Sequence, residues 1–167
     1  MAAPAPRDGV VGGMPAGTPE VPNPRANQAK QDGIRFQNAS GNALATAGYR
    51  VQWQPEVRPE DNIASGKDPD MRLGDNIADV VAPTSSDPDQ VRKALSRKVS
   101  SGQAYHAVLN LSRTDVTLDE VETLLQRKPI AGLQELIVIE KNGAISRVLP
   151  DPEQITPMSP SSMPQVP

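Results

Sequence analysis

The pattern of apolar and polar positions predicts several strands along the chain. Residues 49–54 alternate between apolar and polar side chains, which is typical of a half-buried strand and places Trp53 in the core. A short turn containing Asn142-Gly143 predicts a type I′ hairpin between the last two strands. The remaining apolar runs of strand length are residues 104–111, 136–140 and 144–150.

Helical spacing of apolar residues occurs in three segments, which are residues 36–47, 89–101 and 117–128. Asp87, followed by Pro88, suits the start of the second helix, and Thr117 with Glu120 forms a capping box at the start of the third. Residues 70–81 read as a strand, a tight turn and a second strand. This order of elements predicts a single α/β domain with a central mixed sheet flanked by helices.

Composition separates the two ends of the chain from this domain. Prolines concentrate in residues 1–31 and 151–167, which also carry few large apolar side chains. Such segments cannot bury enough surface to offset the entropy lost on ordering. We therefore expect both to be disordered and the folded domain to cover residues 32–150.

The residue inventory excludes several kinds of site. The chain has no cysteine and one histidine, which rules out disulfides and thiolate chemistry and argues against a zinc site or a Ser-His triad. Its net charge of −3 argues against a strongly basic surface for nucleic acid, although local basic patches stay open. The first residues lack the basic and apolar regions of a signal peptide, and no segment has the apolar length of a membrane span.

The hairpin over residues 70–81 raises a question of register. If residues 74–75 form a two-residue loop, which the leading glycine favours, Asp70 lies directly opposite Asp79 on the same face. Their Cβ atoms would then be about 4.5–5.5 Å apart. A three-residue loop would instead place Asp70 opposite Val80.

Two carboxylates so close repel each other unless a cation lies between them. We therefore interpret Asp70 and Asp79 as a metal site, and their oxygen ligands favour Mg²⁺ or Mn²⁺ over zinc. The simpler alternative is that Asp70 begins a loop and Asp79 accepts backbone hydrogen bonds at the end of a strand. Spacing alone leaves both interpretations open.

Lys98 lies in the apolar stripe of the helix predicted over residues 89–101. It follows Val91 by seven residues and points in nearly the same direction, where a lysine is costly unless its ammonium reaches a partner. Either Lys98 extends to the rim near the helix end, or it reaches the site of Asp70 and Asp79. Two acids and a lysine around a metal suit phosphodiester hydrolysis. The other stripe residues are Ala94, Leu95 and Val99.

Three basic residues, Arg92, Lys93 and Arg97, fall off this stripe and form either a solvated face or contacts to phosphate. His106, midway along a predicted strand, is expected to be structural rather than a catalytic base. Aromatic residues make up 2% of the chain, which leaves little for base stacking. Recognition of a folded RNA through its backbone and shape fits this composition better.

Three blocks of sequence carry a resemblance to a known family. They are "KDPDMRLGDNIADVVAPT", "VRKALSRKVSSGQAYHAVLNL" and "PIAGLQELIVIEKNGAISRVLP", and they occur in the family's order. Over residues 34–150 the chain resembles the C-terminal tRNA-nuclease domain of CdiA-type contact-dependent inhibition toxins. Those domains belong to the PD-(D/E)XK nuclease superfamily.

The resemblance implies that Asp70, Asp79 and Lys98 are the catalytic residues, with Mg²⁺ or Mn²⁺ held by the two aspartates. It also implies tRNA as the substrate and a cognate immunity protein as a partner. Such domains are part of larger secreted proteins and act in the cytoplasm of a target cell. Gln103 follows the family pattern and either caps the helix or contacts the substrate.

The first helix departs from the family pattern. Relatives carry a glutamate there that completes the acidic site, whereas this chain reads Gln37-Asn38-Ala39. An amide oxygen can still ligate Mg²⁺, so Gln37 takes this place in the predicted site, with lower metal affinity expected from one fewer carboxylate. Three hypotheses follow: a metal-dependent tRNA endonuclease toxin, a nuclease-fold binding module with weakened catalysis, and a DNA-directed nuclease.

Overall fold

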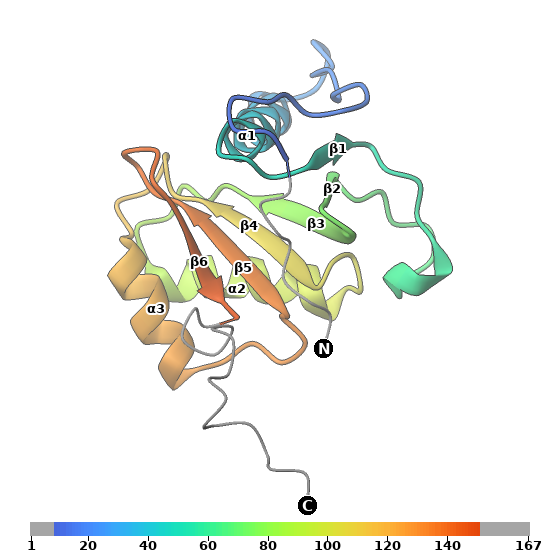
Figure 1. Cartoon of the computed structure of the whole chain (residues 1–167). Coiled ribbons are helices and arrows are strands. Elements are labelled where there is room, and N and C mark those ends of the chain that lie inside the picture. The colour runs from blue at the N-terminus through green and yellow to red at the C-terminus, as the bar shows by residue number, and fades with distance from the viewer. Residues whose placement is uncertain (1–8, 151–167) are drawn as a thin grey trace, which may run out of the picture.

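Six strands form one mixed sheet in the order of the sequence (Figure 1). This computed structural model describes residues 9–150. The first three strands pair antiparallel, β3, β4 and β5 pair parallel, and β6 returns antiparallel to β5. The strands are β1 (Val51–Trp53), β2 (Met71–Leu73), β3 (Asn76–Val81), β4 (His106–Asn110), β5 (Glu135–Ile139) and β6 (Ile145–Leu149).

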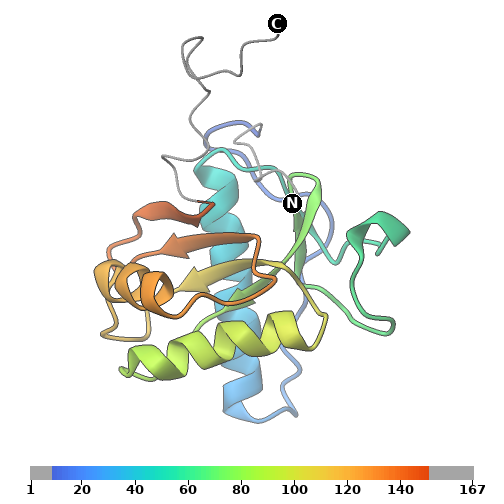
Figure 2. The same ribbon diagram turned by 90° about the horizontal axis from the view of Figure 1, so that it is seen from below.

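Helices cover both faces of the sheet. Because β3, β4 and β5 are parallel, their connections must cross over, and α2 and α3 do so on one face. Figures 1 and 2 show α1 on the opposite face. The predicted α/β fold with a central mixed sheet flanked by helices is therefore confirmed. The helices are α1 (Gln28–Thr46), α2 (Pro88–Ser100) and α3 (Leu118–Arg127), with a 3-10 turn, η1, at Pro59–Asp61.

Each face of the sheet has its own buried core. On the side of α2 and α3, residues such as Val91, Leu95 and Val121 pack against Leu109 and Leu136. On the side of α1, the predicted core residue Trp53 is 4% exposed. A Cβ at Gly41 would overlap the Trp53 ring, so glycine allows α1 to approach β1 closely.

The ends of α2 and α3 follow the predicted capping chemistry. Asp87 accepts a hydrogen bond from the Asp89 N–H at 3.0 Å, and Thr117 and Glu120 form the capping box. At the end of α2, Gly102 takes a left-handed φ of 70°. None of the helices in residues 9–150 combines the length and apolar character needed to cross a bilayer.

The N-terminal boundary differs from the prediction. Helix α1 begins at Gln28, and residues 9–27 pack against the domain rather than being disordered. The Ala16 N–H donates to the Val51 carbonyl at 2.8 Å, and the Trp53 N–H donates to the Ala16 carbonyl at 2.9 Å. Backbone pairing with the edge strand β1 orders this segment, which its side-chain composition does not reveal. The rest of the predicted tails, residues 1–8 and 151–167, lies outside the described residues.

The turn between β5 and β6 also differs. Gly143 has a φ of 87°, whereas Asn142 is not left-handed, so the predicted type I′ turn is wrong. The Gly143 N–H donates to the Glu140 carbonyl at 2.9 Å, and the Glu140 N–H donates to the Ala144 carbonyl at 2.8 Å. Gly143 serves as the left-handed residue that follows the turn, the arrangement of a three-residue hairpin loop.

Candidate functional site

The hairpin of β2 and β3 has the register that brings two aspartates together. Leu73 pairs with Asn76, so the loop between the strands has two residues, and Gly74 supplies the left-handed φ of 61° that it requires. The three-residue loop is therefore excluded. In this register Asp70, directly before β2, falls opposite Asp79 of β3.

The two aspartates are joined by reciprocal backbone hydrogen bonds. The Asp70 N–H donates to Asp79 Oδ1 at 2.9 Å, and the Val80 N–H donates to Asp70 Oδ2 at 2.8 Å. Each carboxylate therefore holds the opposite strand, which fixes both side chains at the end of the hairpin. The simpler alternative from the sequence, backbone acceptance by Asp79, is present alongside the close pairing of the two acids.

Lys98 reaches this pair from α2. Its Nζ lies 3.1 Å from Asp79 Oδ2, and its side chain is 29% exposed while that of Asp79 is fully buried. The neighbouring stripe residues Val91, Leu95 and Val99 are buried against the sheet, so packing of α2 sets the position of Lys98. The structure thus brings Asp70, Asp79 and Lys98 together, while their chemical roles stay predictions.

Burial controls the ionisation of both acids. Burial, and then repulsion from Asp79, raises the pKa of Asp70 to about 7. Burial also raises the pKa of Asp79, while the charge of Lys98 acts in the opposite direction. One lysine therefore stands against two carboxylates, an imbalance that a bound cation would remove.

A cavity of about 450 Å³ connects Asp70 with α1. Gln37 lines this cavity from α1 and is 7% exposed. Its amide has no hydrogen-bond partner within residues 9–150. Glu20, from the segment before α1, lines the same cavity. Asp70 is therefore linked to Lys98 by way of Asp79. It also shares the cavity with Gln37 and Glu20.

The residues of this site fit a hydrated divalent cation. Asp79 Oδ2 is buried and has no hydrogen-bond partner in the described part of the chain, although it pairs with Lys98. The donors are carboxylate and amide oxygens, which Mg²⁺ and Mn²⁺ prefer. No three His, Cys, Asp or Glu side chains among residues 9–150 form a ready metal-binding group. Mg²⁺ commonly uses one or two carboxylates and keeps several waters, which matches such a donor set.

The other predicted site residues lie on α2 or directly after it. Arg92 donates to the carbonyls of Lys128 and Pro129 at 2.7 and 2.9 Å, so it ties α2 to the end of α3. Lys93 and Arg97 are exposed. The Gln103 N–H donates to the Lys98 carbonyl at 3.1 Å, which is a backbone cap of α2. No hydrogen bond or ion pair within residues 9–150 joins these four residues to the aspartates.

A buried ion pair beside the site was not predicted. Arg72 of β2 donates to both carboxylate oxygens of Asp61 at 2.8 Å and to the Glu56 carbonyl at 3.0 Å. The hydrogen bonds from Arg72 hold the pKa of Asp61 below its usual range. This pair fastens the long loop before Asp70 to the sheet. The sequence signal for this ion pair is an arginine between two apolar residues, Met71 and Leu73, in a short strand.

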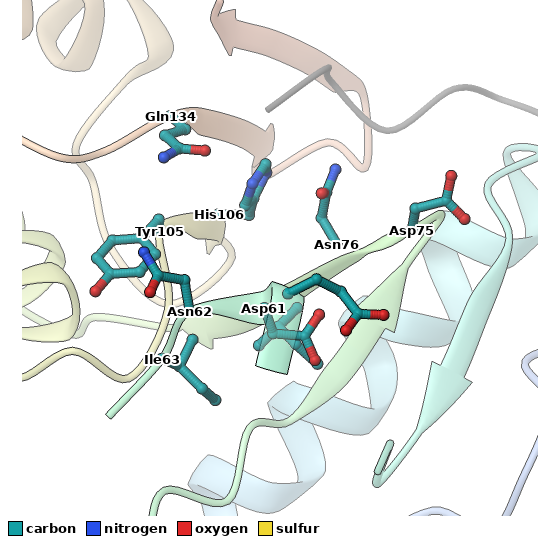
Figure 3. Close-up of a pocket in the computed structure, with 10 residues that line it drawn as sticks. Asp61, Asn62, Ile63, Asp75, Asn76, Tyr105, His106 and Gln134 are labelled. Carbon is teal, nitrogen blue, oxygen red and sulfur yellow. The ribbon is translucent and has the colours of Figure 1, made fainter. Parts of the chain in front are cut away.

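A second cavity, of about 360 Å³, lies at the start of β3 and β4 and is separate from the first. Figure 3 shows His106 and Gln134 on one side of it and Asp61 and Ile63 on the other. His106 is buried, and its Nδ1 lies 2.9 Å from Glu135 Oε1. This pairing within the sheet agrees with the predicted structural role of His106.

Comparison with known proteins relates the chain to one family. A family model described as contact-dependent growth inhibition CdiA C-terminal domain matches residues 67–145, which include Asp70, Asp79 and Lys98. The chain is 31% identical over 138 residues to a tRNA nuclease CdiA-2 of Burkholderia pseudomallei strain 1026b, a match that spans 83% of this chain and 4% of that protein.

A solved structure gives the same result. The chain resembles a protein in a CdiA-CT/CdiI toxin and immunity complex from Burkholderia pseudomallei, with a TM-score of 0.74 and 31% sequence identity. This match covers 81% of the chain and 98% of the solved one. Sequence and fold therefore agree, and the chain belongs to the CdiA C-terminal domain family.

Proposed function

We propose that this chain is a toxin domain that cleaves tRNA as a metal-dependent endoribonuclease. The observation that carries the proposal is the cluster of Asp70, Asp79 and Lys98, held by backbone hydrogen bonds and an ion pair of 3.1 Å. Support for the substrate comes from the relative named a tRNA nuclease. The cluster also supports chemistry of the PD-(D/E)XK type.

Each residue of the cluster has a distinct role in this proposal. Asp70 and Asp79 hold the divalent cation, with the Gln37 amide oxygen as a further donor from across the cavity. When bound, the cation stabilises negative charge that develops on the phosphate. Lys98 favours the ionised form of Asp79 and adds positive charge beside the reacting group. The Asp70 N–H orients Asp79 by donating to its Oδ1.

Substrate contact is expected along the exposed side of α2. Lys93 and Arg97 are solvent-accessible there and can meet phosphates, whereas Arg92 is committed to α3. The side chain of Gln103 is free to contact the substrate, since only its backbone caps α2. The low aromatic content supports recognition through shape and backbone.

The relatives support a partner and a route of delivery. The similar solved protein lies in a complex with an immunity protein, so we infer that a cognate immunity protein binds this chain. The chain spans about 4% of the length of the curated relative that it matches. We infer that the domain is delivered as part of a larger secreted toxin and acts in the cytoplasm of the target cell.

The test is incubation of the purified chain with total tRNA in the presence of Mg²⁺, Mn²⁺ or EDTA, beside Asp79→Ala. The proposal expects cleavage that needs the metal and is lost in the variant. Intact tRNA in every reaction contradicts it. Duplex DNA under the same conditions tests the DNA-directed alternative.

One observation favours a second candidate, a binding module with weakened catalysis. The buried residue that faces Asp70 across the cavity from α1 is an amide, Gln37, rather than a carboxylate. Gln37→Glu separates the two functions. Under the second candidate the wild-type chain binds tRNA without cutting it, and the substitution raises both metal affinity and cleavage.

A further inference from the structure

The segment before α1 is tethered at several points beside the candidate site. Asn38 of α1 donates through Nδ2 to the Glu20 carbonyl at 2.8 Å. Gln54 donates through Nε2 to the Thr18 carbonyl at 2.9 Å. Ala16 pairs with β1 on both its N–H and its carbonyl. These hydrogen bonds set the backbone of Glu20 at the mouth of the cavity that Asp70 lines.

The lining of this cavity has one sign of charge. Glu20, Asp68 and Asp70 contribute carboxyl groups, and no basic residue is among its described lining residues. Glu20 and Asp70 line the same cavity, so a cation there would have both carboxyl groups around it. Such a cavity concentrates cations rather than the phosphates of a nucleic acid.

Gln37 provides an independent indication of a ligand. Its side chain is more than nine-tenths buried, lines the cavity, and makes no hydrogen bond within residues 9–150. The amide atoms open into the cavity, so water or a ligand there can complete their hydrogen bonds. A hydrated cation in the cavity would meet this need, with its waters between the amide and the surrounding carboxylates.

We propose that Glu20 is a further residue of the metal site, where it accepts hydrogen bonds from the water shell of the cation. Glu20 is exposed and belongs to no ready three-ligand group, so contact through water suits its position better than direct ligation. The inference rests on the proposed function, because it concerns the same cation. It makes the segment before α1 part of the site.

The test measures Mn²⁺ binding to the purified chain by calorimetry and by loss of the free Mn²⁺ electron paramagnetic resonance signal. Glu20→Gln removes the charge while its backbone contacts remain, and it should weaken binding roughly fivefold. Glu56→Gln is the matched control, because Glu56 is exposed and lies between two lining residues, Pro55 and Val57. The control should bind within about twofold of wild type. Asp70→Asn should weaken binding more than Glu20→Gln.

A rescue variant separates the cavity charge from an effect on folding. Gln37→Glu, added to Glu20→Gln, returns one carboxylate to the same cavity and should restore most of the lost affinity. Unchanged binding in Glu20→Gln, with weakened binding in Asp70→Asn, overturns the inference and leaves the metal site intact. If wild type and Asp70→Asn bind Mn²⁺ equally weakly, the result contradicts the proposed function itself. The inference about Glu20 is then overturned as well.

Discussion

The two sides of the candidate site are built in different ways. Asp70, Asp79 and Lys98 lie within 29 residues of the sequence, and a tight hairpin and the following helix bring them together. On the other side, Glu20 and Gln37 come from the segment before α1 and from α1 itself, and long-range hydrogen bonds position them. Local register determines the first side, and docking of a distant segment determines the second.

This difference bears on what each side contributes. The hairpin side is buried and held by backbone hydrogen bonds, so its charges act on one another with little screening by water. Glu20 is exposed, in a segment held by hydrogen bonds such as that from Asn38, so solvent screens its interaction with a cation more strongly. Substitutions on the hairpin side should therefore have the larger effects on cleavage, and those on the N-terminal side should mainly tune metal affinity.

The largest effect is expected from Asp79→Ala. Loss of this carboxylate removes a metal ligand and the partner of Lys98, and tRNA cleavage should fall roughly 10³-fold. Single-turnover cleavage of total tRNA at saturating Mg²⁺ measures it. Glu56→Gln is the control that should cleave at the wild-type rate. An Asp79→Ala variant that retains cleavage would show that the hairpin is not the reaction site.

Lys98→Met should have the next largest effect. The buried Asp79 loses its cation, so the variant should unfold more easily by about 2–3 kcal/mol and cleave roughly a hundredfold more slowly. Lys93→Met, on the exposed side of the same helix, is the matched control for stability. Urea unfolding at pH 8 measures stability. Equal stability of the two variants would mean that the ion pair contributes little.

The same contrast explains which features could be predicted from the sequence. Gly74-Asp75 favoured one loop length, and that length alone set Asp70 opposite Asp79. Lys98 was identifiable because burying an unpaired ammonium on an apolar helix face is energetically costly. Both inferences depend on residues close together in the sequence. The strand period of two and the helix period of 3.6 are sufficient to place such side chains on one face.

The features that were missed depend on long-range backbone contacts. Residues 9–27 are rich in proline and poor in large apolar side chains, which predicts disorder. The backbone of Ala16 nevertheless pairs with β1. No side-chain pattern records such a hydrogen bond. The Arg72–Asp61 pair likewise joins a strand to a long loop. The number of residues between the two therefore follows neither the helix nor the strand period, and the pair could not be predicted from it. Glu20 could therefore be recognised only after the docked segment was seen.

Asp70→Asn probes the charge balance of the hairpin side. Because the pKa of Asp70 is raised to about 7 in the folded state, the folded protein binds a proton more tightly than the unfolded chain. Wild-type stability should therefore fall as pH rises from about 4 to about 7, and the variant should lose less. At pH 8 without metal the variant should be more stable by on the order of 1–2 kcal/mol.

Urea unfolding from pH 4 to pH 8 measures this difference. An asparagine can still accept the Val80 hydrogen bond, so the comparison isolates the charge. Mn²⁺ at pH 8 should stabilise wild type more than Asp70→Asn, because binding to the folded state adds to stability. Parallel pH curves for the two proteins would mean that Asp70 does not carry the buried charge.

The smallest effect is expected from Asn38→Ala, which tests the N-terminal side without changing any charge. The substitution removes the hydrogen bond to the Glu20 carbonyl and leaves the hairpin untouched. Because Glu20 is then held less firmly, Mn²⁺ affinity should fall about threefold, while the rate of cleavage at saturating metal stays near wild type.

Asn42→Ala, an exposed position one turn further along α1, controls for the change in helix propensity and should bind Mn²⁺ as wild type does. A loss of cleavage at saturating metal in Asn38→Ala would contradict the separation of the two sides. It would mean that docking of the segment before α1 also sets the geometry of Asp70 and Asp79, so that the local hairpin is not sufficient to build the reactive part of the site.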